Sequence, residues 1–180
     1  MILLLTGTPG TGKTTISQLL AKKLEARLVA VNQLVEEKHL YTGLDPEKHY
    51  KIVDIPALLE NMDEIGQDYQ DRADWLIFEG HLSHYYPAAD LVVVLRASPP
   101  ILRERLKKRK WKPEKVKENL EAEALDICAW EAGDIHGAQA QEIDTTQKTP
   151  PDVLDAILGL VKGETTSPVG GVNFLDQMDL

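Results

Sequence analysis

A glycine-rich segment near the beginning of the chain has the residue types and the spacing needed to hold phosphate groups. It covers residues 7–15, reads GTPGTGKTT, and follows the apolar run at residues 2–5. Glycines allow a tight turn in which successive backbone N–H groups point into one concavity. A glycine, four residues and then Gly-Lys-Thr, placed between a strand and a helix, is the pattern of a P-loop. The segment therefore predicts binding of a nucleoside triphosphate.

The polar side chains of this loop have distinct expected roles. We expect Lys13 to reach the β- and γ-phosphates, and the Thr14 hydroxyl to ligate Mg²⁺, which prefers oxygen ligands. A helix beginning near Lys13 adds its positive dipole end to the phosphate cradle. Thr15 is placed to contact the α-phosphate, while Gly10 and Gly12 allow the turn that brings backbone N–H groups to the phosphates.

An acid and a histidine follow a later apolar run at residues 75–78. P-loop enzymes use a carboxylate at the end of a neighbouring strand to hold Mg²⁺ through water, and we expect Glu79 to be this second metal ligand. A neutral imidazole can accept a proton near pH 7, so His81 is a candidate for orienting a water or contacting a phosphate. The alternatives are a capping role for Glu79 and a structural or surface role for His81. We expect His84 to be structural.

A cluster of cations contrasts with the acidity of the whole chain. The formal net charge is -9 at pH 7, yet nine of the 20 Lys and Arg residues lie between Arg103 and Lys117. Five of them surround Trp111, next to Pro113, at a break between two predicted helices. This pattern predicts a mobile lid over the triphosphate, with Arg109 stabilising the charge of the transferred phosphoryl group. An RNA- or protein-binding face and a plain exposed helix are the alternatives.

Composition limits the class of protein. A chain of 180 residues with 43% hydrophobic and 27% charged residues is typical of one globular domain. The negative net charge argues against general binding to nucleic acids or membranes. A single cysteine, Cys128, excludes an intramolecular disulfide and a multi-cysteine zinc site. Because no apolar run is long enough for a signal peptide or a transmembrane helix, we expect a soluble, cytoplasmic protein.

Short apolar runs alternate with helical patterns, which is typical of a parallel sheet covered by helices on both faces. Strands are expected at residues 2–5, 28–31, 75–78, 91–95 and 141–144. Helices are expected at residues 13–24, 32–38 and 151–161. Three further helices are expected to begin at a proline, namely at Pro56, at Pro99 and at Pro113, and the last of them to reach about Trp130. Residues 41–52 are polar and are expected to be irregular. The fold class is therefore α/β, a P-loop NTPase with a five-stranded parallel sheet.

The chain is expected to form one domain over residues 1–163 and to end in a flexible tail over residues 164–180. The tail is rich in Gly, Ser, Thr and Asp and has little periodicity. A partner-binding peptide is the alternative interpretation of this segment.

Several segments together resemble a known family. The P-loop, the stretch Leu40–Gly43, the acid-x-His element Glu79–His81, and the segments 94–96 and 104–109 are similar to those of the adenylate kinase 6 family, also called Fap7 or CINAP. The similarity is closest to archaeal members and covers about residues 1–162. It implies a nucleoside monophosphate kinase layout with a short lid.

The resemblance implies transfer of the γ-phosphate of ATP to AMP, with some intrinsic ATPase activity. It also implies a role in maturation of the small ribosomal subunit through binding of the ribosomal protein uS11, with pre-ribosomal RNA approached only indirectly. The monophosphate-binding region would be at about residues 30–53 and the lid at about 108–118. The implied ATP-contacting residues are Gly10, Gly12, Lys13, Thr14, Thr15 and Arg109.

Two positions depart from this family. Glu79 stands where the family often has Asp, which lengthens the reach to the metal by one methylene. Glu36 stands where animal members carry an arginine suited to the AMP phosphate, and Lys38 or His39 are candidates to replace that arginine. The residue that holds the AMP phosphate is therefore left open.

Two other functions remain alternatives to an adenylate kinase. One is an assembly ATPase that binds uS11 and has little AMP kinase activity, with Glu79 and His81 positioning the attacking water. The other is a small-metabolite kinase of similar fold. A GTPase is excluded because no Asn is followed by the Lys-x-Asp that reads guanine, and the Asp-x-x-Gly match at residues 63–66 lies at a helix end.

Overall fold

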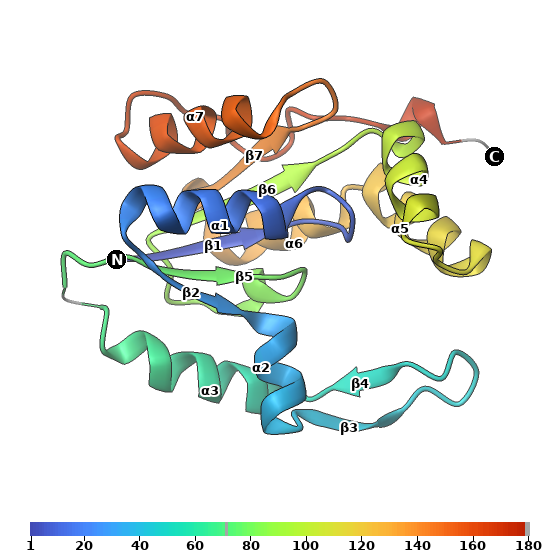
Figure 1. The fold of residues 1–180 in the computed structure, drawn as a ribbon, viewed down its shortest axis with the longest axis horizontal. Helices are drawn as coiled ribbons and strands as arrows, with labels where there is room; N and C mark the ends of the chain where they lie inside the picture. The colour runs from blue at the N-terminus through green and yellow to red at the C-terminus, as the bar shows by residue number, and fades with distance from the viewer. Residues whose placement is uncertain (71, 179–180) are drawn as a thin grey trace.

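The computed structural model describes residues 1–70 and 72–178. A five-stranded parallel sheet with the order β2-β5-β1-β6-β7 forms its centre, and Figure 1 shows it between layers of helices. Its strands are β1 (Ile2–Thr6), β2 (Arg27–Ala30), β5 (Leu76–Glu79), β6 (Leu91–Arg96) and β7 (Ala140–Asp144). The predicted fold class, with its five strands, is confirmed.

Helices cover both faces of the sheet. On one face lie α1 (Lys13–Leu24) and α7 (Pro150–Val161), and on the other lie α2 (Val31–Lys38), α3 (Ile55–Gln67) and α6 (Ile127–His136). Strand side chains alternate between the two layers, so that Leu3 and Leu5 pack with the first pair of helices, whereas Ile2 and Leu4 pack with the second group. Every residue of β1 is buried, as expected for a central parallel strand.

Helix ends agree with local sequence signals. Thr149 and Asp152 form a capping box at the start of α7, and the Asp54 side chain accepts from the backbone N–H of Ala57 at the start of α3. The remaining helices α4 (Pro99–Lys108) and α5 (Pro113–Ala124) begin with proline, which has no N–H to leave unsatisfied. Within the described part of the chain, no helix is long and apolar enough to cross a membrane.

Two local predictions differ from the structure. The polar segment expected to be irregular contains an antiparallel hairpin of β3 (Tyr41–Leu44) and β4 (Lys51–Val53). The single helix expected from Pro113 to about Trp130 is two helices, α5 and α6, separated at Asp126, where φ is 57°. Asp tolerates this left-handed conformation better than most residues, and its side chain pairs there with Arg96.

The segment expected to be a flexible tail is folded along the edge strand β7 over its described residues. The Glu142 side chain accepts the backbone N–H groups of Gly171 and Val172 at 2.7 Å each. Phe174 is 5% exposed and lies over the guanidinium of Arg96 at 5.4 Å. Side chains of the sheet therefore satisfy backbone groups of a segment that has no periodicity of its own, and the flexibility of this segment stays a prediction. Residues 179–180 lie outside the described residues.

Candidate functional site

The P-loop connects the end of β1 to the start of α1, at the edge of the sheet towards which the strands point in Figure 1. The loop needs glycine at Gly7 and Gly10, where φ is 135° and 94°. A Cβ atom added to Gly7 would lie 2.3 Å from the carbonyl oxygen of Leu95, and one added to Gly10 would lie 2.8 Å from the side chain of Leu102. The loop therefore packs tightly against the end of β6 and against α4.

Lys13 is buried beneath this loop. Its Nζ donates to the carbonyl oxygens of Gly7 at 2.8 Å and of Thr8 at 3.1 Å. Burial lowers the pKa of Lys13 to about 8, although Glu79 acts in the opposite direction. The ammonium is thus held by two neutral acceptors with little water around it, a state in which an anion would be strongly attracted.

A cleft of about 770 Å³ brings the predicted catalytic residues together. Its lining includes Lys13, Thr14, Glu79, His81 and Arg109, which come from the P-loop, the end of β5 and the lid. Lys13, Glu79 and His81 meet because the strands that precede them end at one edge of the sheet, whereas Arg109 lies at the end of α4.

A second cavity of about 380 Å³ lies on the other side of the P-loop. Its lining includes Thr15, Arg105 and Lys148, and it shares Gly10, Gly12 and Arg109 with the larger cleft. Arg105 also donates to the carbonyl oxygen of Gly10 at 3.3 Å. The sequence analysis counted Arg105 only as one cation of the basic run. Its contact with the loop depends on how α4 packs, which the local sequence does not reveal.

Glu79 and His81 of the larger cleft also have shifted pKa values. Burial raises the pKa of the half-buried Glu79 carboxyl, while Lys13 opposes the shift. Burial, followed by repulsion from Lys13 and His84, lowers the pKa of His81 to about 4. His81 is therefore a neutral imidazole near pH 7 and has a free lone pair for a proton. His84, in contrast, is buried and bonded to Thr6 and Glu131, as a structural histidine would be.

We expect part of the acid sensitivity of the fold to come from His81. Its pKa of about 4 lies below the ordinary value of 6.5 for histidine, so unfolding takes up a proton between these pH values. The contribution of His81 to stability is complete above its pKa in the unfolded chain. It is lost as the pH falls towards its pKa in the folded protein. Between about pH 7.5 and about pH 5, the Tm of wild type should therefore fall further than that of His81→Gln, which cannot titrate. Equal losses would contradict this prediction.

The lid and the hairpin contact each other across the mouth of the larger cleft. Lys48, at the hairpin turn, lies 2.6 Å from Glu118 of α5. Lys115 of α5 lies over the ring of Trp111 at 4.0 Å and over the ring of Tyr50 at 5.2 Å. The predicted lid is thus in contact with the predicted monophosphate region, with aromatic rings and a cation facing the space between them.

The residue facing Glu36 in this cleft is one that the sequence analysis did not single out. Lys51 pairs with Glu36 at 2.6 Å and lies over the ring of Tyr41 at 4.6 Å. Lys51 and Glu36 both line the cleft. Of the two candidates from sequence, His39 bonds to the Tyr41 hydroxyl at 3.1 Å. Among the described residues, the lining of the cleft includes neither Lys38 nor His39. The cation beside Glu36 in the lining of the cleft is therefore Lys51, the first residue of β4.

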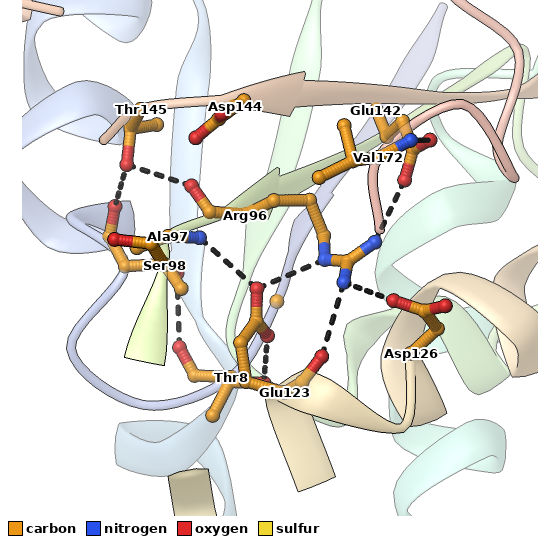
Figure 2. Close-up of polar contacts among 12 residues, drawn as sticks. Thr8, Arg96, Ala97, Ser98, Glu123, Asp126, Glu142, Asp144, Thr145 and Val172 are labelled. Carbon is orange, nitrogen blue, oxygen red and sulfur yellow. Dashed lines mark hydrogen bonds and ion pairs between the residues drawn. The ribbon is translucent and has the colours of Figure 1, made fainter. Parts of the chain in front are cut away.

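A buried ionic network contacts the P-loop through the hydrogen bond between Glu123 and Thr8, as Figure 2 shows. Arg96, at the end of β6, is 1% exposed and donates to Glu123 and Glu142 at 2.9 Å each and to Asp126. Burial alone would lower the pKa of Arg96, but the carboxylates of Glu123 and Asp126 raise it. In the sequence, this network is indicated only by an arginine at the end of an apolar strand, because the partners of Arg96 lie at least 27 residues away.

Comparisons with known proteins agree with this architecture. The family model described as "AAA domain" matches residues 3–126. A solved shikimate kinase from Acinetobacter baumannii superposes with a TM-score of 0.58 at 20% identity, covering 91% of this chain and 94% of that one. Thymidylate kinase from Candida albicans gives 0.57 at 14% identity, with 91% of each chain covered. At such identities these two likenesses concern the fold alone, which is that of P-loop kinases.

Sequence relatives are much closer. A protein of Methanothermobacter thermautotrophicus named "Putative adenylate kinase" is 40% identical over 94% of this chain and 95% of its own length. A protein of the same name from Pyrococcus abyssi is 40% identical over 99% of this chain and 94% of its own length. With residues 3–126 matched by the AAA domain model and nearly the whole length shared with these relatives, the chain belongs to the same family as these archaeal proteins.

Proposed function

We propose that the protein is an adenylate kinase that transfers the γ-phosphate of Mg-ATP to AMP. The observation that carries this proposal is the pair of cavities that share Gly10, Gly12 and Arg109. A donor nucleoside in the smaller cavity and an acceptor in the larger one would direct their phosphates towards the same shared residues. The name carried by the archaeal relatives supports the same reaction.

In this proposal the protein acts mainly by positioning and by charge. Phosphoryl transfer passes through a loose, highly charged transition state, so little covalent chemistry is required of the enzyme. Lys13 would leave the carbonyl oxygens of Gly7 and Thr8 for the phosphate oxygens, which accept a stronger, charge-assisted hydrogen bond. Arg109, exposed at the end of α4, would close over the transferred group and stabilise its charge.

The side chains present at the loop fit a magnesium ion. Thr14 and Glu79 both line the larger cleft, and they offer a hydroxyl and a carboxylate oxygen. These are the hard ligands that Mg²⁺ prefers, and the ion ordinarily keeps several waters and phosphate oxygens as well. When bound, it would neutralise part of the phosphate charge.

We propose the acceptor phosphate to be held by Lys51 rather than by Lys38 or His39. Lys51 lines the cleft and pairs with the exposed carboxylate of Glu36, a partner that a phosphate could displace. Surface pairs of this kind contribute little stability, so exchanging Glu36 for a dianionic phosphate costs little.

Intrinsic ATP hydrolysis is a second proposed activity, favoured by the position of His81. A neutral imidazole beside Lys13 and Glu79 in the cleft is suited to orient a water when no acceptor is present. The family resemblance extends this to an assembly role in which the protein binds uS11 during maturation of the small ribosomal subunit. The formal net charge of -9 favours attraction of a basic protein partner.

The test is ADP formation from Mg-ATP, measured alone, with AMP, with other monophosphates and small hydroxylated metabolites, and with purified uS11. We expect AMP to accelerate ADP formation well above basal hydrolysis. A different best acceptor would contradict the adenylate assignment while retaining kinase activity. Acceleration by uS11 but not by AMP would favour the assembly ATPase, and a pull-down without uS11 binding would count against that role.

A further inference from the structure

Thr8 occupies a special place in the P-loop. Its side chain is buried, and its hydroxyl donates to Oε2 of Glu123 at 2.5 Å, a contact visible in Figure 2. Its carbonyl oxygen accepts from Nζ of Lys13 at 3.1 Å and from Oγ1 of Thr11 at 2.9 Å. One residue therefore joins a carboxylate outside the loop to the ammonium and the hydroxyl within it.

Glu123 is itself fixed on several sides. It is 1% exposed and lies in the last turn of α5. Its Oε1 accepts from Nε of Arg96 at 2.9 Å and from the backbone N–H of Ala97 at 3.0 Å, while its own carbonyl oxygen accepts from Nη2 of Arg96 at 3.1 Å. The remaining carboxylate oxygen is thus presented to Thr8 in one orientation.

The carboxylate lies outside the lining of both cavities of the site. Among the described residues, Glu123 lines neither the larger cleft nor the smaller cavity, whereas Lys13 and Thr14 line the former. A carboxylate close to the phosphates would also repel them, and Glu123 is separated from the cleft by the loop that it holds. Glu123 contacts the loop through its hydrogen bond to Thr8, and its charge also acts through space on Lys13.

We propose that Glu123 is a positioning residue of the P-loop, which acts through the Thr8 hydroxyl to hold the loop in its phosphate-receiving conformation before nucleotide arrives. A loop that is already ordered does not lose conformational freedom on binding. It therefore binds the nucleotide more tightly than a mobile loop with the same contacts would. Because Glu123 also belongs to α5, the lid helix and the phosphate loop share one anchor. The inference rests on the proposed function only in requiring that the loop binds a triphosphate.

The experiment compares Thr8→Val, which removes the hydroxyl but keeps the shape, with Thr8→Ser, which keeps the hydroxyl. The dissociation constant of Mg-ATP is measured by calorimetry and the Tm by calorimetric scanning. Thr8→Val should weaken binding about tenfold or more, the effect of losing a hydrogen bond to a charged group, while Thr8→Ser stays within about twofold of wild type.

A matched control separates positioning from general loss of stability. Leu58→Val shortens a fully buried side chain of α3, on the sheet face away from α1, and should lower the Tm without changing Mg-ATP affinity. Glu123→Gln is the second test variant and should also weaken binding. In the double variant with Thr8→Val, the loss of affinity should be smaller than the product of the two single losses, because both changes act on the same contact.

The outcomes are distinguishable. If Thr8→Val and Glu123→Gln lower the Tm but bind Mg-ATP as wild type does, Glu123 is merely structural and the inference is wrong. It is also overturned if the two effects multiply independently. If wild type binds Mg-ATP but transfers no phosphate to AMP, the proposed function is contradicted. The binding data for the variants would then still decide this inference.

Discussion

A Lys13→Met variant should lose phosphoryl transfer by at least about 10²–10³-fold, the usual effect of removing one preorganised charge-stabilising donor. The ammonium is the buried cation of the loop, and its acceptors among the described residues are the carbonyl oxygens of Gly7 and Thr8. Methionine keeps most of the length and apolar contact of the side chain but cannot stabilise the charge that develops on the phosphate oxygens. The loss should appear in both AMP-dependent transfer and intrinsic hydrolysis.

The same variant should fold as well as wild type. Burial lowers the pKa of Lys13 to about 8, which means that the fold holds its charged form at a cost near neutral pH. Replacing this ammonium by a neutral side chain removes that cost, so the Tm should not fall in proportion to the activity. The matched control is Lys22→Met on the exposed side of α1, which should keep full activity. Retained turnover in Lys13→Met would mean that the loop has been misinterpreted.

Arg96→Met should lower the free energy of unfolding by about 3–5 kcal/mol, the typical cost of removing one partner from a buried ion pair. The side chains of Arg96, Glu123 and Glu142 are each 1% exposed. Without the guanidinium, the two carboxylates remain buried with no cation between them. Urea unfolding measures the loss, provided that the variant keeps the two-state transition of wild type.

Two further variants identify the cause of that loss. Arg72→Met removes an arginine whose side chain is 60% exposed, pairs with Asp74 and lies over the ring of Tyr69, so it should cost about 1 kcal/mol or less. Adding Glu142→Gln to Arg96→Met removes one uncompensated charge and should recover part of the stability. If Arg96→Met unfolded at the same urea concentration as wild type, the network would not contribute to the stability of the fold, and this prediction would be wrong.

The parts of the fold that sequence predicts well are those controlled by local pattern. The glycines at positions 7, 10 and 12 and the apolar strand before them identify the phosphate loop, because tight turns and buried parallel strands leave characteristic residues behind. The alternation of apolar runs and amphipathic helices gives the five strands and their layers for the same reason. The meeting of Lys13 with Glu79 and His81 follows from the rule that parallel strands end at one edge.

The missed features depend on partners distant in sequence. The break at Asp126 and the folded segment after residue 163 are both stabilised by side chains of Arg96 and Glu142, which no local pattern connects to them. The hairpin of β3 and β4 is short and mostly exposed, so its strands lack the apolar alternation that identifies a half-buried strand. Lys51 was overlooked because its relevance comes from pairing with Glu36 in the larger cleft.

The most direct test of the adenylate kinase assignment follows the acceptor rather than the donor. The protein is incubated with Mg-ATP and AMP labelled in its adenine ring, and the label is followed into ADP, with Lys13→Met as the inactive reference. We expect the label to move from AMP to ADP only when ATP is present, with two ADP formed for each ATP consumed beyond basal hydrolysis. If ADP accumulates while the label stays in AMP, the γ-phosphate goes to water and the protein is not an adenylate kinase.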